Sequence, residues 1–128
     1  MIKAIIVEDE GVAARMMQRL LESKNVEILD TITSITDLKS HLMSPGEVDV
    51  YFMDIHLSDG VVFDLLSEQV IETPIIFTTA YDQYAIKAFK QNSIDYLLKP
   101  IDEDDLDRAI DKFNKQKPQV DILSLIHI

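Results

Sequence analysis

Several apolar runs of this 128-residue chain end in residues that could do chemistry. Three acids, Glu8 to Glu10, follow the first run, and Asp54 interrupts another. Thr78 and Thr79 close a later run, and Lys99 follows the last one. Carboxylates that face one another repel, and a bound cation relieves the repulsion; oxygen ligands favour Mg²⁺ or Ca²⁺. The cluster of acids therefore indicates a metal, with Mg²⁺ the natural choice.

A carboxylate beside Mg²⁺ and a lysine ammonium can attack phosphorus, because both cations offset the charge on the transferring phosphoryl oxygens. The product would be an aspartyl phosphate on Asp54. The hydroxyl of Thr79 could then donate a hydrogen bond to a phosphoryl oxygen. The residue types therefore predict a nucleophile, a counter-cation and a phosphate sensor.

Each of these residues also has a plainer interpretation. Acids at the start of a helix gain about 0.3–1 kcal/mol from the helix dipole, which alone would explain Glu8 to Glu10. Threonines commonly fill strands, and lysines are commonly solvated. Asp54 fits such an explanation less well, because it ends a buried strand with no turn residue beside it. All of these residues are expected at one crevice, beyond the carboxyl ends of the strands, and their combination there favours a functional site.

The elements that would position these residues alternate between strand and helix. Short runs rich in Ile, Val and Phe predict buried strands, and 3.6-residue periodicity predicts the helices between them. The strands are expected at Lys3–Val7, Val26–Asp30, Val50–Met53, Pro74–Thr78 and Ile94–Leu98. Such alternation predicts a parallel sheet with helices on both faces, whose ligands bind beyond the carboxyl ends of the strands.

Composition limits the classes of function. Hydrophobic residues form 47% and charged residues 27% of the chain, a balance typical of one globular domain. There is no cysteine, so disulfides and thiolate metal sites are excluded. The net charge of −11 disfavours binding to nucleic acid or to anionic membranes. No apolar run approaches the roughly 20 residues of a membrane helix, and we expect a cytoplasmic protein whose partners are proteins.

Glu8-Asp9, Asp54, Thr79-Ala80 and Lys99-Pro100 together resemble the response-regulator receiver domains of two-component signalling. The resemblance covers roughly residues 2–115, and we expect a receiver domain over residues 1–117. It implies an α/β fold with one doubly wound, five-stranded parallel sheet. This fold is flavodoxin-like, with strand order 2-1-3-4-5 and five helices.

By the same resemblance, Asp54 is the phosphoacceptor, phosphorylated by a sensor histidine kinase. The metal ligands would be Glu8, Asp9, Asp54 and the backbone carbonyl of His56. They would hold Mg²⁺, with Mn²⁺ as the alternative. Glu8 has one more methylene than the aspartate many receivers carry there, so direct and water-mediated ligation both stay open. Thr79 and Lys99 would assist the reaction at Asp54.

The resemblance also implies a switch. Tyr96, three residues before Lys99, would swing inward when Thr79 engages the phosphate, although a tyrosine there could equally belong to the core. The peptide bond between Lys99 and Pro100 would be cis. Phosphorylation would change the surface of the fourth helix, fifth strand and fifth helix, where the chain could dimerise. Such a protein would not be an enzyme acting on a separate substrate, although slow autodephosphorylation could occur.

Residues 81–89 and 94–101 are similar to receivers of the LytTR class, which usually precede a DNA-binding domain. We therefore expect the chain to be the receiver part of a longer transcription regulator, with DNA bound only by a domain outside this chain. Residues 118–128 form an apolar tail without helical periodicity. The tail could be a linker, a truncated next domain or an expression scar.

The loop after Asp54 departs from the family pattern. Many receivers have a longer, proline-containing loop there, whereas Gly60 follows after only five residues. We expect Gly60 to supply a flexible turn into the third helix, with Asp59 capping that helix. The side chain of His56 is expected to be an exposed loop residue, because Mg²⁺ prefers oxygen. His41 and His127 carry no signal of a site.

Three other functions share parts of this pattern. A flavodoxin-like cofactor binder would need a phosphate loop where this chain has acids. An aspartyl phosphohydrolase would be expected to carry an Asp-x-Asp motif after the strand. In this chain the motif would begin at Asp54, but His56 occupies the position of its second aspartate. A degenerate receiver acting as a phosphate-independent interaction module remains an alternative, although the whole phosphorylation set is present.

Overall fold

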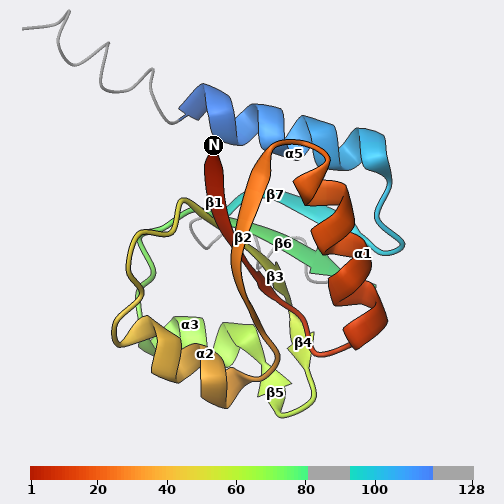
Figure 1. Ribbon diagram of the computed structural model, residues 1–128. Coiled ribbons are helices and arrows are strands. Elements are labelled where there is room, and N and C mark those ends of the chain that lie inside the picture. The colour runs from red at the N-terminus through yellow and green to blue at the C-terminus, as the bar shows by residue number, and fades with distance from the viewer. Residues whose placement is uncertain (81–92, 117–128) are drawn as a thin grey trace, which may run out of the picture.

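The computed structural model describes residues 1–80 and 93–116. Along these residues the first strands and helices alternate, and a short hairpin, β4–β5, lies between β3 and α3, as Figure 1 shows. The strands are β1 (Ile2–Val7), β2 (Val26–Ile32), β3 (Val50–Asp54), β4 (His56–Leu57), β5 (Gly60–Val61), β6 (Ile75–Thr79) and β7 (Ser93–Leu98). The helices are α1 (Gly11–Glu22), α2 (Ile35–Leu42), α3 (Val62–Glu68) and α5 (Glu103–Gln116).

Five of the strands form one parallel sheet in the order β2-β1-β3-β6-β7. In sequence order these are the five predicted strands, so the predicted order 2-1-3-4-5 is confirmed. The predicted strand bounds differ from the observed ones by at most two residues at either end. Apolar runs locate buried strands well because both faces of a parallel sheet are covered.

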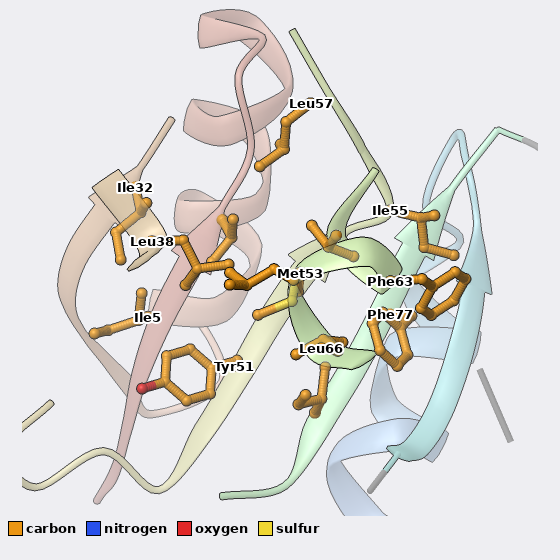
Figure 2. Packing of buried hydrophobic residues seen from close by; sticks show 14 residues of the cluster. Ile5, Ile32, Leu38, Tyr51, Met53, Ile55, Leu57, Phe63, Leu66 and Phe77 are labelled. Carbon is orange, nitrogen blue, oxygen red and sulfur yellow. The ribbon is translucent and has the colours of Figure 1, made fainter. Parts of the chain in front are cut away.

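Two apolar clusters cover the two faces of the sheet. Side chains alternate between faces along a strand, so Ile5 and Ile6 of β1 enter different clusters. The cluster shown in Figure 2 joins Ile5, Tyr51, Met53 and Phe77 of the sheet to Leu38 of α2 and to Phe63 and Leu66 of α3. The opposite cluster joins Ile6, Phe52 and Ile76 to Leu21 of α1 and to Leu106 and Phe113 of α5. Helices α1 and α5 thus cover one face, and α2 and α3 cover the other (Figure 1).

Some predictions fall on other parts of the chain. Four of the five predicted helices are seen, and the remaining one, between β6 and β7, would lie in residues 81–92, outside the described residues. The tail at 118–128, with His127, also lies outside them. None of the helices in the described ranges, 1–80 and 93–116, is long and apolar enough to span a membrane.

The segment after Asp54 is more ordered than the expected short loop. His56–Leu57 and Gly60–Val61 pair as an antiparallel hairpin, β4 and β5, with Ser58 and Asp59 at its turn. Gly60 has φ of 151°, a backbone conformation open to glycine and strained for other residues. The prediction that Asp59 caps the third helix was wrong: α3 begins after Val61 without a side-chain cap, and Asp59 binds the first turn of α2.

Candidate functional site

The predicted functional residues meet at the carboxyl edge of the sheet. Asp54 is the last residue of β3 and Thr79 the last of β6, while Glu8 follows β1 and Lys99 follows β7. The registers bring these ends together, since Val7 pairs with Met53, Asp54 with Thr78, and Thr79 with Leu98. The parallel arrangement therefore joins residues that are as many as 91 positions apart in sequence.

Three carboxylates gather at this edge. Glu8, Asp9 and Asp54 each offer one oxygen, and these oxygens lie within 4.8 Å of one another. Glu8 is only 5% and Asp54 only 6% exposed, whereas Asp9 is exposed. Burying neighbouring carboxylates is unfavourable unless positive charge compensates them. Three negative groups facing the single ammonium of Lys99 leave a local excess of negative charge, and their hard oxygen atoms fit a divalent cation such as Mg²⁺.

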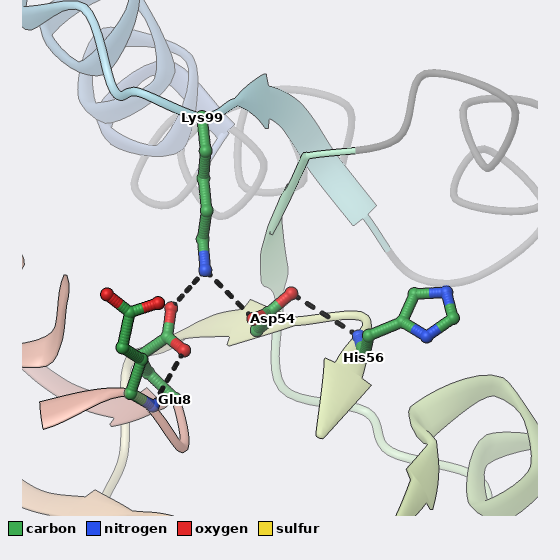
Figure 3. A network of polar contacts seen from close by, with 5 residues as sticks. Glu8, Asp54, His56 and Lys99 are labelled. Atoms are coloured by element: carbon green, nitrogen blue, oxygen red, sulfur yellow. Dashed lines mark hydrogen bonds and ion pairs between the residues drawn. The ribbon is translucent and has the colours of Figure 1, made fainter. Parts of the chain in front are cut away.

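Lys99 bridges two of these carboxylates (Figure 3). Its Nζ donates to Oδ2 of Asp54 at 2.9 Å and also to Oε1 of Glu8. Burial lowers the pKa of Lys99, but the hydrogen bonds to Glu8 and Asp54 outweigh burial and raise the pKa above its ordinary value. The lysine is therefore a fixed cation at neutral pH. It is not the freely solvated surface residue of the plainer interpretation.

Glu8 is held by a second contact. Its Oε2 accepts the backbone N–H of Glu10 at 3.1 Å, so both oxygens of its carboxylate have hydrogen-bond donors. Glu10 occupies the N-cap position of α1 but makes no side-chain cap bond. Simple capping of α1 thus does not account for the acids after β1, because Glu8 turns toward the sheet edge instead.

His56 contacts the site through its backbone. Its N–H donates to Oδ1 of Asp54 at 3.3 Å, so the two oxygens of Asp54 face different donors, His56 and Lys99. Figure 3 shows the imidazole of His56 directed away from the Asp54 carboxylate. The expectation of an exposed loop residue was wrong, because His56 begins strand β4 and is partly buried.

Thr79 and Tyr96 lie on the neighbouring strands. Thr79 is completely buried, and its backbone carbonyl accepts the N–H of Lys99 at 2.8 Å. Tyr96 pairs with Phe77 across β6 and β7 and is partly buried against the apolar cluster of α2 and α3. The peptide bond between Lys99 and Pro100 is cis.

An apolar cavity of about 370 Å³ adjoins the acidic cluster on the α1 side. Glu8 and Lys99 line one part of it, and the rest includes Val12, Met16, Pro100 and Ile101. Val12 is 55% and Met16 57% exposed, although both are apolar residues of α1. The cavity is therefore open to solvent, and exposed apolar side chains of α1 form part of its wall next to the carboxylates.

The sequence did not indicate the partners of two polar residues, His41 and Asp59. His41, which carried no signal, lies with Nε2 2.8 Å from the hydroxyl of Tyr51. Burial raises the pKa of that tyrosine, so its hydroxyl stays protonated at neutral pH. Asp59 anchors the hairpin by accepting the N–H of Ile35 at the start of α2, a partner that lies 24 residues away in sequence.

Comparison with known proteins identifies relatives that match most of the chain. Residues 4–111 match the family described as the response regulator receiver domain. The sensory transduction protein LytT of Bacillus anthracis is 39% identical over 121 residues, which cover 91% of this chain and 49% of that protein. LytT of Bacillus subtilis is 35% identical over 120 residues, covering 90% of this chain and 49% of that protein. The chain thus spans about half the length of these curated relatives.

Solved structures of response regulator domains share this fold. The response regulatory domain of the protein mrkE from Klebsiella pneumoniae superimposes with a TM-score of 0.78 at 30% sequence identity. That match covers 92% of this chain and 99% of the mrkE domain. The shared fold thus extends over nearly the complete mrkE domain.

Proposed function

The chain belongs to the response regulator receiver family, and from this premise we propose that it is a phosphoryl-accepting switch whose acceptor is Asp54. One observation supports this role most strongly: the Asp54 carboxylate lies in a cluster of acids and is bound by the ammonium of Lys99. A nucleophile, a fixed cation and oxygen ligands for a divalent metal are thereby within reach of one another.

Glu8, Asp9, Asp54 and the carbonyl of His56 would hold Mg²⁺ or Mn²⁺, which when bound supplies positive charge opposite the phosphoryl oxygens. An oxygen of Asp54 attacks the phosphorus of a phosphohistidine, the P–N bond breaks, and the released imidazole takes up a proton. Lys99 is already 2.9 Å from Asp54 and neutralises part of the charge that arrives with the phosphoryl group. The product is an aspartyl phosphate.

The bound phosphate would be sensed by Thr79. Its hydroxyl, at the end of the strand next to Asp54, donates a hydrogen bond to a phosphoryl oxygen in the phosphorylated state. Tyr96 then moves further inward from its partly buried position and changes the surface of β7 and α5. That surface would form a homodimer together with the fourth helix expected in residues 81–92.

We assign the phosphodonor role to a sensor histidine kinase. Such a partner must bring its phosphoryl group to Asp54, and the exposed apolar face of α1 beside the carboxylates offers it a contact surface. DNA binding is assigned to a domain outside this chain, because a receiver with net charge −11 would be repelled by phosphates. Residues 118–128 would be a linker to that domain, a truncated part of it, or an expression scar.

A phosphodonor experiment tests the switch against the hydrolase. Acetyl phosphate is added to the protein with Mg²⁺, and ³¹P NMR follows the acyl phosphate signals with time. An acyl phosphate signal from the protein that persists over many successive spectra supports a switch. Rapid conversion of acetyl phosphate to inorganic phosphate, without such a signal, would instead indicate a phosphohydrolase and contradict the proposal.

A further inference from the structure

The turn of the β4–β5 hairpin is tied to the start of α2 by the carboxylate of Asp59. Oδ1 accepts the backbone N–H of Ile35 at 2.8 Å. Oδ2 accepts both the backbone N–H and the hydroxyl of Thr36, each at 3.2 Å. The contact joins segments that are 23 and 24 residues apart in sequence. It is thus a tertiary contact, although its geometry is that of a helix cap.

The same hairpin is attached to the phosphoacceptor at its other end. His56, the first residue of β4, donates its N–H to Oδ1 of Asp54 at 3.3 Å. The N–H of Val62 donates to the carbonyl of Ile55 at 2.9 Å where the hairpin closes. Leu57 is 7% exposed and packs into the apolar cluster of α2 and α3. The segment that carries His56 is therefore fixed at its base by Asp54 and at its tip by Asp59.

We propose that Asp59 is a positioning residue of the phosphorylation site: by fixing the hairpin tip to α2, it holds the backbone of His56 in place for metal binding and for reaction at Asp54. This role rests on the proposed function. Two-residue β4 and β5 form a hairpin too small to be stable by itself, so its position depends on outside contacts.

The Asp59 contact is strong enough to serve this purpose. Hydrogen bonds to an ionised carboxylate are about twice as strong as those between neutral groups, and a negative charge at the start of a helix is further stabilised by the helix dipole. The hydrogen bond from Ile35, with those from Thr36, lowers the pKa of Asp59 despite a smaller opposing contribution from desolvation. The carboxylate is thus ionised, and the tether formed, at neutral pH.

The same helix end provides a matched control. Ser34 is the N-cap residue of α2, and its hydroxyl oxygen accepts the N–H of Asp37 at 3.0 Å. Removing that bond with Ser34→Ala weakens the start of α2, as loss of a cap does, without removing the link to the hairpin. Asp59→Ala removes both a cap of α2 and the link. The two variants therefore separate helix stability from site positioning.

The test compares Asp59→Ala, Asp59→Asn and Ser34→Ala with the wild-type chain. Calorimetric titration gives the Kd for Mg²⁺, acetyl phosphate gives the rate of phosphorylation, and urea unfolding gives stability. We expect Asp59→Ala to weaken Mg²⁺ binding by about tenfold, the size typical of lost outer contacts to a metal site, and to slow phosphorylation. Asp59→Asn, which keeps one acceptor oxygen, should fall between, while Ser34→Ala should lose stability only.

The outcomes are distinguishable. Wild-type Mg²⁺ affinity and phosphorylation rate in both Asp59 variants would overturn the positioning role, as would equal losses in Ser34→Ala. If Asp59→Ala does not fold, Asp59→Asn decides the question by the same comparison. A wild-type chain that neither binds Mg²⁺ nor becomes phosphorylated would instead refute the proposed function on which this inference rests.

Discussion

The ammonium of Lys99 lies 2.9 Å from Oδ2 of Asp54, although the two residues are 45 positions apart and lie at the ends of two strands, β7 and β3, that are not neighbours in the sheet. The ends of β3 and β7 lie on either side of β6, so a side chain as long as lysine is needed to reach across. Without this ammonium, Glu8 and Asp54 would be two buried carboxylates near Asp9 with no positive side chain paired to them among residues 1–80 and 93–116.

Replacing Lys99 by methionine should destabilise the metal-free protein by about 1–3 kcal/mol, because two buried carboxylates lose their counter-ion. Mg²⁺ should restore more stability to this variant than to the wild type, since the metal then supplies the missing positive charge. Urea unfolding with and without Mg²⁺ measures both effects.

Lys3→Met is the matched control for Lys99→Met. The Lys3 ammonium lies 3.8 Å from Glu47, whose side chain is 93% exposed, so its loss should cost at most about 0.5 kcal/mol. Equal unfolding midpoints for Lys99→Met and the wild type without Mg²⁺ would show that the Lys99 pair does not stabilise the site.

Thr79→Ala should leave Asp54 able to accept a phosphoryl group but abolish the phosphate-dependent formation of dimers. The buried hydroxyl of Thr79 is the group proposed to report the phosphate to Tyr96, and alanine removes it. Sedimentation velocity with acetyl phosphate and Mg²⁺ measures dimerisation, while mass spectrometry checks phosphorylation. Thr79→Ser, which keeps the hydroxyl, should retain the response. Unchanged dimerisation in both Thr79→Ala and Tyr96→Ala would count against this coupling.

Asp59 should titrate below the ordinary aspartate range. The N–H of Ile35 and the donors of Thr36 stabilise its ionised form, so its pKa is lower in the folded than in the unfolded chain. Its contribution to stability is therefore fully present above the unfolded pKa of about 3.9 and is lost as pH falls through the lower, folded pKa. Carboxyl ¹³C NMR of Asp59 measures the shift directly. A pKa at or above the ordinary value would show that the hydrogen bonds to α2 do not persist in solution.

Phe77→Ala should destabilise the chain by about 3–5 kcal/mol. Phe77 is fully buried in β6 and makes an edge-to-face contact with Phe63 of α3, with ring centroids 5.4 Å apart. Met43→Ala, at a side chain that is 85% exposed, should change stability by no more than about 0.5 kcal/mol. Similar unfolding midpoints for the two variants would contradict the assignment of Phe77 to the core.

The sequence predicted best those features that depend on local pattern. The five strands of the main sheet follow from short runs rich in apolar residues, although polar residues interrupt β2, and their shared carboxyl edge explains why Glu8, Asp54 and Lys99 could be expected together. The strand order came from the family resemblance, since apolar patterning does not say which strands are neighbours.

The features that were missed depend on contacts between distant segments. Asp59 precedes α3 in sequence, where a local cap was the natural expectation, but its carboxylate binds α2 because the hairpin turns its tip toward Ile35. The contact between His41 and Tyr51 likewise joins α2 to β3, and neither residue shows a pattern that indicates its partner. Such hydrogen bonds form because the tertiary fold brings distant segments together. The pattern of a single sequence does not show which segments will meet.

Phosphorylation of Asp54 itself is measured most directly by intact-mass spectrometry. The wild-type chain and Asp54→Asn are incubated with acetyl phosphate, with and without Mg²⁺. We predict one phosphoryl addition to the wild type that requires Mg²⁺ and is absent in Asp54→Asn. A folded wild-type protein that binds Mg²⁺ yet gains no mass, or an addition that persists in Asp54→Asn, would contradict the assignment of Asp54 as the phosphoacceptor.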